Sequence, residues 1–170
     1  MPFRIALAAL ALSLAACTGS APVAVAPAPT PDPTPAASAP RVTDGEAVRT
    51  GVRALLDMQV AAWNDGSIRG FMDGYTRADS LTFLSGGSLR QGWQESYYAY
   101  VRGYPDRESM GTLGFEEIVI RPLADDLALA YGRWRLTYAD DRPESSGLFS
   151  LLVRRGDEGW RVVHDHTSSG

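Results

Sequence analysis

The chain has 170 residues, of which 45% are hydrophobic and 9% aromatic, and its formal net charge is -4. This length allows one domain and a tail, and the apolar content is sufficient for a globular core. The modest negative charge excludes the strongly basic balance of nucleic-acid-binding proteins, so we expect no nucleic-acid partner. Cys17 is the only cysteine in the sequence, which excludes a disulfide within the chain.

Residues 1–16 resemble a bacterial signal peptide. A short basic start is followed by an apolar segment, residues 5–14, which is too short to span a bilayer as a mature helix. Leu14-Ala15-Ala16-Cys17 then resembles the lipobox of bacterial lipoproteins, which implies cleavage before Cys17 and attachment of lipid to it. The alternative is an ordinary secretory signal that is cut near Ala16. Both interpretations predict an exported protein, and lipid on Cys17 would anchor it to the membrane.

A linker follows the cysteine and extends to residue 40. It consists mainly of Pro, Ala, Thr and Ser and has almost no large apolar side chain, so it cannot bury enough surface to fold. The prolines favour an extended polyproline conformation, which makes residues 17–40 a semi-rigid spacer. We therefore expect the folded domain to comprise residues 41–170.

The domain begins with two predicted helices. Thr43 and Glu46 have the spacing of a capping box, and Asn64-Asp65-Gly66 marks the end of the first helix. Its apolar face recurs at steps of three and four and consists of Val48, Val52, Leu55, Leu56, Gln59 and Trp63. Ser67 can cap a second, shorter helix, whose inner face would contain Ile68, Phe71, Met72 and Tyr75.

A third helix is predicted to start after Gly92 and to end before Pro105. A short strand at residues 81–84 and a tight turn at residues 85–88 precede it. Its helical spacing places five side chains in one stripe, namely Trp93, Tyr97, Tyr100, Val101 and Tyr104. Such a stripe indicates core packing more often than a cofactor site, and it would serve both roles if the helix covered a cavity.

The remainder of the chain predicts a β-sheet. Residues 112–120, 124–138, 145–155 and 160–168 have the composition of long strands. Their connections are short, which favours antiparallel neighbours. Helices that precede a series of such strands predict an α+β fold, with the N-terminal helices packed on one face of a curved antiparallel sheet.

The last strand contains both histidines of the sequence. Side chains alternate between the two faces of a strand, so Trp160 and Val162 are predicted to share a face with His164 and His166. Arg161, Val163, Asp165 and Thr167 then occupy the opposite face. We expect one face to line a pocket and the other to contact a partner subunit.

This order of elements resembles the nuclear transport factor 2-like superfamily, whose fold is the cystatin-like α+β cone. Within it, the small SnoaL-like domains and the association domain of calcium/calmodulin-dependent kinase are most similar. Four pieces carry the resemblance, namely residues 62–66, Gly92-Trp93, residues 135–138, and Arg154-Arg155 together with residues 159–168. It covers residues 41–170 and implies a conical cavity closed by the helices, with a homodimer formed through the convex face of the sheet.

The resemblance also implies site residues. Several family members line the cavity with an arginine at the position of Arg135, and the association domain has two more, at the positions of Ser150 and Thr167. If Arg135 points inward, Asp165 is its natural partner, because an isolated buried charge is costly. The alternatives are a structural ion pair and a solvated strand face. The expected ligand pocket also contains Trp63, Tyr75, Trp93 and Tyr97.

Three functions fit these features. The first is an exported, lipid-anchored binding module, forming a homodimer, that holds a small and partly apolar ligand with Arg135 against any acidic group. The second, implied by a similarity to ketosteroid isomerases and polyketide cyclases, is an isomerase, cyclase or hydrolase. Asp165 would be its general base, with a pKa tuned by burial and by Arg135. The third is a pure assembly domain with a filled cavity. None of the three requires a cofactor.

The two histidines are predicted to act outside the pocket. His164 and His166 are two residues apart on one strand, which separates their imidazoles by roughly 6.5–7 Å. The alternation places them on the convex face, opposite Asp165, where we expect a dimer-interface or hydrogen-bonding role. A metal site would need a third ligand, and the sequence spacing provides none. We therefore predict no metal.

Overall fold

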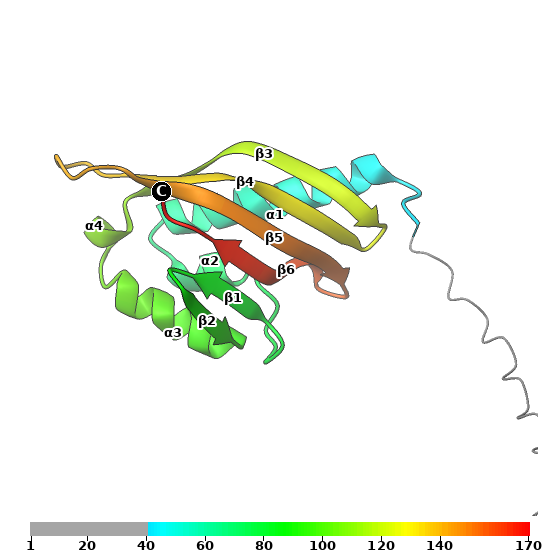
Figure 1. The fold of residues 1–170 in the computed structure, drawn as a ribbon, viewed down its shortest axis with the longest axis horizontal. Coiled ribbons are helices and arrows are strands. Elements are labelled where there is room, and N and C mark those ends of the chain that lie inside the picture. Colours follow the sequence, from blue (N-terminus) through cyan, green and yellow to red (C-terminus); the bar gives the residue numbers. More distant parts are fainter. Residues whose placement is uncertain (1–40) are drawn as a thin grey trace, which may run out of the picture. The chain divides into compact units, whose positions relative to one another are not determined.

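The computed structural model describes residues 41–170 (Figure 1). The predicted signal peptide, Cys17 and the linker lie outside the described residues. The described part contains, in order, α1 (Gly45–Asn64), α2 (Ile68–Met72), β1 (Thr82–Ser85), β2 (Ser88–Gln91), α3 (Trp93–Gly103), α4 (Arg107–Met110), β3 (Thr112–Ala124), β4 (Leu127–Thr137), β5 (Ser145–Gly156) and β6 (Gly159–Thr167). No helix among these is long and apolar enough to cross a membrane.

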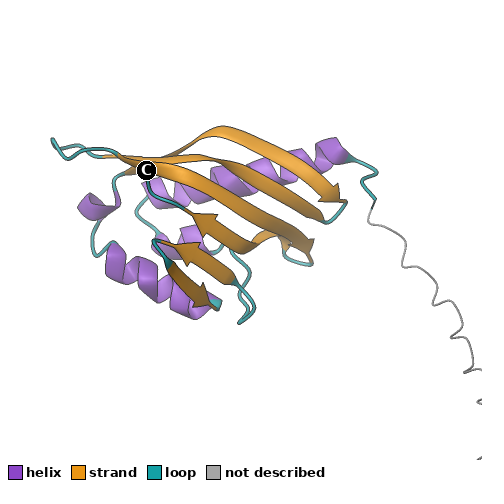
Figure 2. Ribbon diagram, viewed as in Figure 1, coloured by secondary structure: helices purple, strands orange, loops and turns teal. Residues whose placement is uncertain are grey.

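The strands form one sheet in the order β2-β1-β6-β5-β4-β3, and the helices lie along one side of it (Figure 2). This arrangement confirms the predicted α+β class. The pairs are antiparallel except for β1 and β6, which run parallel. The four long strands are antiparallel neighbours as predicted, and the parallel pair involves β1, whose partner the sequence did not indicate. A short connection requires that the two strands it joins run antiparallel. Most of the domain lies between β1 and β6 in the sequence, so this pair can be parallel.

Helix α1 buries the face that its sequence pattern predicts. All six predicted side chains are buried, from Val48 at its start to Trp63 at its end. The predicted cap was wrong by one residue, because the Asp44 carboxylate accepts the capping bond from the backbone N–H of Ala47, at 2.9 Å. Thr43 instead donates to the carboxylate of Asp125, from its backbone N–H at 2.6 Å and from its hydroxyl at 2.8 Å. These bonds fix the start of the domain to the turn between β3 and β4.

The boundary between β3 and β4 differs from the prediction. The sequence predicted that one strand ends at residue 120 and the next begins at residue 124, but β3 continues to Ala124 and the chain turns at Asp125 and Asp126. Proline is tolerated within β3 because this strand forms an edge of the sheet, where a missing N–H removes no necessary ladder bond.

An irregularity in β6 changes which of its side chains face the helices. His164 pairs with Leu152 of β5, but Val162 pairs with the next residue of β5, Val153, so one extra residue of β6 is accommodated between the two pairs. Such a bulge reverses the alternation of side chains on the strand. Trp160 and Val162 are consequently buried on the same side as Asp165. The predicted grouping of these two residues with the histidines was wrong.

The inner face of β4 determines where the sheet leaves space. Residues on this face alternate along the strand, and the first are small, with Ala128 and Ala130 fully buried. They are followed by Gly132, where an added Cβ would lie 2.7 Å from the carbonyl oxygen of Glu116. Trp134 and Leu136 then extend from the far end of the strand and line a cavity.

Candidate functional site

A cavity of about 220 Å³ lies between the sheet and the helices. Nine of its 20 lining residues are aromatic. They come from α1, from α2 and α3 and the residues directly after these two helices, and from β1, β3, β4 and β5. They are Trp63, Phe71, Tyr75, Phe83, Tyr100, Tyr104, Phe115, Trp134 and Phe149. The cavity is smaller than the range of about 300–1,000 Å³ that holds drug-sized ligands. Its size and lining suit a small molecule with an apolar or aromatic body.

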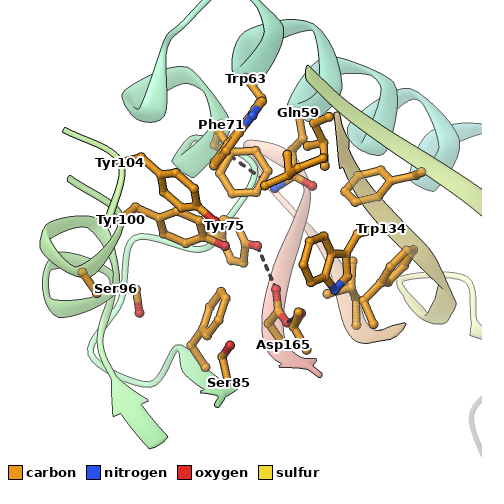
Figure 3. Close-up of a pocket in the computed structure, with 18 of the residues that line it drawn as sticks. Gln59, Trp63, Phe71, Tyr75, Ser85, Ser96, Tyr100, Tyr104, Trp134 and Asp165 are labelled. Carbon is orange, nitrogen blue, oxygen red and sulfur yellow. Dashed lines mark hydrogen bonds between the residues drawn. The ribbon is translucent and has the colours of Figure 1, made fainter. Parts of the chain in front are cut away.

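Asp165 provides the buried carboxyl group of this cavity. The residue is 3% exposed. Its Oδ2 accepts a hydrogen bond from the Tyr75 hydroxyl at 2.8 Å (Figure 3), and its Oδ1 accepts one from the Thr167 hydroxyl at 2.7 Å. None of the arginines in residues 41–170 forms an ion pair with it. The carboxyl is therefore held by two hydroxyl groups and has no positively charged partner in the described domain.

Burial dominates the acid–base properties of this cluster. It raises the pKa of Asp165 from 3.8 to about 6, although the hydrogen bonds from Thr167 and Tyr75 oppose the shift. Burial, followed by the negative charge of Asp165, also raises the pKa of Tyr75 and that of Tyr100 well above the usual tyrosine value. Both phenols therefore stay protonated at neutral pH. The pKa of Asp165 lies close to neutral pH, so this carboxyl group can gain or lose a proton there.

Helix α3 presents a different face to the cavity from the one predicted. Tyr100 lines the cavity together with Ser96 and Ala99 of the same helix, and Tyr104, which directly follows the helix, lines it as well. Trp93 and Tyr97 were predicted to line it and do not. Their rings stack on each other with centroids 5.2 Å apart, and the Trp93 indole N–H donates to the backbone carbonyl of Met72 at 2.8 Å.

The arginines of α2 and of the loop that follows cover this stack from outside. The guanidinium of Arg69 lies 4.9 Å from the ring centroid of Trp93, and that of Arg77 lies 5.3 Å from it. Trp93 and Tyr97 therefore attach α3 to α2, and they shape the cavity only indirectly. The stripe that the sequence showed is divided between two faces of the helix.

Arg135 is not in the cavity, which corrects the main site prediction. Its side chain is 38% exposed, and its guanidinium pairs with Glu116 at 2.9 Å and also with Glu144. The predicted parity within β4 is correct, because Arg133 and Arg135 share one face, but that face is the outer one. The inner face belongs to Trp134 and Leu136. Asp165 therefore lacks the predicted partner, and Arg135 takes the alternative role of a surface ion pair.

The other predicted pocket residues divide in the same way. Trp63, Tyr75 and Thr167 line the cavity with Asp165. Ser150 does not, because it pairs with Tyr131 and His166 on the outer face of the sheet. Within residues 41–170, no three His, Cys, Asp or Glu side chains form a group that could hold a metal ion, so His164 and His166 lack a third ligand there.

Sequence reasoning missed Arg90, the only cation among the residues that line this cavity. It lies on β2 opposite Phe83 of β1, which is itself opposite Asp165 of β6. The three residues therefore form a row across adjacent strands and share a face, with the backbones of Arg90 and Asp165 about 10 Å apart. The strand pairing could have identified this row, but β1 and β2 are too short for their partners to be predicted.

Gln59 was predicted to belong to the buried face of α1. In the structure it also lines the cavity. It is 1% exposed, and its amide nitrogen donates to the backbone carbonyl of Phe71 at 3.2 Å. A polar residue on an otherwise apolar helix face was the one signal that could have marked it.

Helices that close an aromatic cavity on one face of a curved sheet define the class of α+β cone domains. Solved structures agree with this assignment. A nuclear transport factor 2-like protein of unknown function from Shewanella oneidensis is 38% identical, with a TM-score of 0.66, and the match covers 71% of this chain and 98% of that one. The present chain belongs to the nuclear transport factor 2-like family.

More distant structures share the fold. A ketosteroid isomerase-like protein from Erwinia carotovora is 19% identical with a TM-score of 0.58, and the match covers 74% of this chain and 98% of that one. A putative calcium/calmodulin-dependent protein kinase II association domain from Xanthomonas campestris is 20% identical with a TM-score of 0.57, covering 78% and 94%. No protein-family model and no curated protein matches the chain.

Proposed function

We propose that the domain binds a small molecule with an apolar or aromatic body in the cavity around Asp165. The observation that supports this most is a buried carboxyl group, free of any ion pair within the described domain, that faces an aromatic cavity. A buried charge is costly unless something compensates for it, so a structural core has little reason to keep one. An assembly domain would instead fill this space with side chains.

Filling the cavity tests this proposal. Ala99 lines the cavity from α3, whereas Ala54 lies exposed on α1. Both variants replace an alanine in a helix with phenylalanine, so they add the same number of atoms and differ only in where those atoms lie. We expect Ala99→Phe to weaken binding of 2-phenylethanol by about tenfold or more, and Ala54→Phe to leave it within about twofold. Tryptophan fluorescence can follow the titration, because Trp63 and Trp134 are in the lining. Equal affinities of the two variants would refute the cavity as the binding site.

A second candidate function is proton transfer, favoured by the pKa of about 6 for Asp165. A general base is most effective when its pKa is close to the working pH. The structural likeness to a ketosteroid isomerase-like protein is compatible with such chemistry, although that likeness carries the fold alone. Incubation with cyclohexanone in D₂O would test it. Proton exchange beside the carbonyl, followed by NMR, should be faster with the wild-type protein than with Asp165→Asn, and equal rates would exclude this function for that ketone.

We also propose a homodimer through the outer face of the sheet. His164 and His166 lie on this face, opposite Leu152 and Ser150. Leu148 on the same face is 53% exposed, and a partner subunit on this face would cover it. Light scattering coupled to gel filtration should show a dimer that Leu148→Asp converts to a monomer. The matched change Tyr98→Asp, at an exposed residue of α3, should leave the dimer intact; a wild-type monomer would refute the proposal.

We propose that the protein is exported and anchored to a membrane by lipid on Cys17, facing the periplasm or exposed at the cell surface. The support comes from the lipobox-like Leu14-Ala15-Ala16-Cys17 and from the linker that follows it. Mass spectrometry of the mature amino terminus should find a diacylglyceryl-modified cysteine that Cys17→Ala abolishes. Cleavage near Ala16 without lipid would instead indicate a secreted protein.

A further inference from the structure

We infer that the cavity recognises a small organic cation, namely an amine whose ammonium group is held between Asp165, Gln59 and the aromatic walls. This inference rests on the proposed ligand-binding function and specifies the chemical class of the ligand. It follows from the direction of the hydrogen bonds around the cavity, from the unpaired carboxyl group and from the character of the walls.

Several hydrogen-bond donors of the lining are used within the protein. The indole N–H of Trp63 donates to the carbonyl of Met110 at 3.1 Å, and that of Trp134 donates to the carbonyl of Ser168 at 3.0 Å. The Ser96 hydroxyl donates to the carbonyl of Gly92 at 3.0 Å. These groups face the cavity with their hydrogen atoms already committed, so they offer a ligand few donors.

Three other polar groups of the lining are committed in the same way. The hydroxyls of Tyr75 and Thr167 both donate to the carboxylate, and the Gln59 amide donates to the Phe71 carbonyl. None of the side-chain hydrogen bonds within residues 41–170 is accepted by the Gln59 carbonyl oxygen. Both ionised carboxylate oxygens retain lone pairs after accepting one bond each. This part of the cavity therefore has acceptors to offer, and it is complementary to a group that donates.

An ammonium group satisfies each of these features. It has N–H donors for the carboxylate and for the amide oxygen, and its charge provides the counter-ion that the domain does not supply to Asp165. Aromatic ring faces also attract cations, most strongly where water is excluded. Figure 3 shows Trp63, Phe71, Tyr75 and Tyr100 on one side of the cavity and Trp134 on another, with Asp165 below Tyr75.

Arg90 sets a limit on where the cation can lie. It is a pure donor with a positive charge, and it lies on β2 two strands away from Asp165. Its charge acts on the phenol of Tyr100 and lowers its pKa against the larger effect of burial. The ammonium group is therefore placed at the β6 side of the cavity, away from β2.

Three probes of similar size distinguish this inference from its alternatives. They are 2-phenylethylamine, 2-phenylethanol and phenylacetate, which carry a cation, a neutral hydroxyl and an anion on the same ring. Calorimetric titration of the purified full chain should show the amine binding about tenfold or more tightly than the alcohol. Asp165→Asn should remove that preference while leaving the alcohol within about twofold. Arg135→Gln, at a residue outside the cavity, should change neither the preference for the amine nor the affinity for the alcohol.

The pH dependence gives a second measurement on the wild-type protein, in case Asp165→Asn does not fold. The groups that face or adjoin Asp165 are Tyr75, Tyr100, Thr167, His166 and, from β2, the charged Arg90. Neither tyrosine loses its proton near neutral pH. The preference for the amine over the alcohol should therefore decrease as the pH is lowered through the pKa of Asp165.

Each outcome bears on one of the two proposals. If the alcohol binds as tightly as the amine, or phenylacetate binds most tightly, the cation inference is wrong and the ligand-binding function stands. If none of the probes binds, the ligand-binding function fails, and the inference fails with it.

Discussion

Replacing Asp165 with Asn is expected to remove a pH dependence of stability. The side chain is buried, and its pKa rises from 3.8 to about 6 in the folded protein. The folded state therefore binds this proton more tightly than the unfolded state does. The resulting stabilisation is fully present below the unfolded pKa and is lost as the pH rises through the folded pKa.

The size of this effect follows from the shift. About two pKa units at about 1.4 kcal/mol each correspond to roughly 3 kcal/mol, which is an upper bound for the stability lost between about pH 4 and pH 7. Asparagine has nearly the same shape and retains a carbonyl acceptor for the Tyr75 hydroxyl, but it does not ionise. The variant should therefore gain stability relative to the wild type as the pH rises.

Urea unfolding of both proteins between about pH 4.5 and about pH 7.5 measures the difference directly. Hydrogen bonds lower the pKa of Glu116 and Asp125, so their contributions change only at more acidic pH. A free-energy difference between variant and wild type that is flat across the window, or that falls with rising pH, would refute a buried carboxyl with a raised pKa.

Two further predictions concern the neighbours of this group and the packing of the helices. Tyr75→Phe removes a donor to Asp165 and should raise the pKa of that carboxyl further, which ¹³C NMR titration can follow; an unchanged pKa would mean that the bond contributes nothing. Gly51→Ala would place a methyl group 2.3 Å from the indole nitrogen of Trp160, and should destabilise the protein by about 1–3 kcal/mol in urea unfolding. Gly103→Ala, which meets no atom within 4 Å, is its control and should not destabilise; equal losses in both would contradict the packing argument.

Periodicity was sufficient to predict α1. Its six buried side chains recur at helical spacing, and the helix packs over one face of the sheet, so local pattern and tertiary contact agree. The same reasoning predicted correctly which residues of β4 share a face, but it did not predict which of the two faces points toward the helices. Arg133 and Arg135 alternate with Trp134 and Leu136, and the family resemblance placed the wrong pair inside. On the outer face Arg135 pairs with Glu116 and Glu144, while the apolar Trp134 and Leu136 face the cavity.

The side chains of β6 could not be placed by alternation alone. The bulge between Val162 and His164 depends on the pairing with β5, and pairing is a property of two strands rather than of one sequence. The same limit applies to Arg90, whose position beside Phe83 and Asp165 depends on a parallel contact between β1 and the last strand. Residues that are distant in sequence thus met at the cavity through strand pairing that no local pattern encodes.

A crystal structure of the protein grown with 2-phenylethylamine tests the central claim most directly. The account predicts density for the amine inside the cavity, with its nitrogen within hydrogen-bonding distance of the Asp165 carboxylate and its ring against Trp134 and Tyr100. A cavity closed by its own side chains, with the amine absent or bound only on the outer surface, would contradict the claim that this domain holds a ligand there.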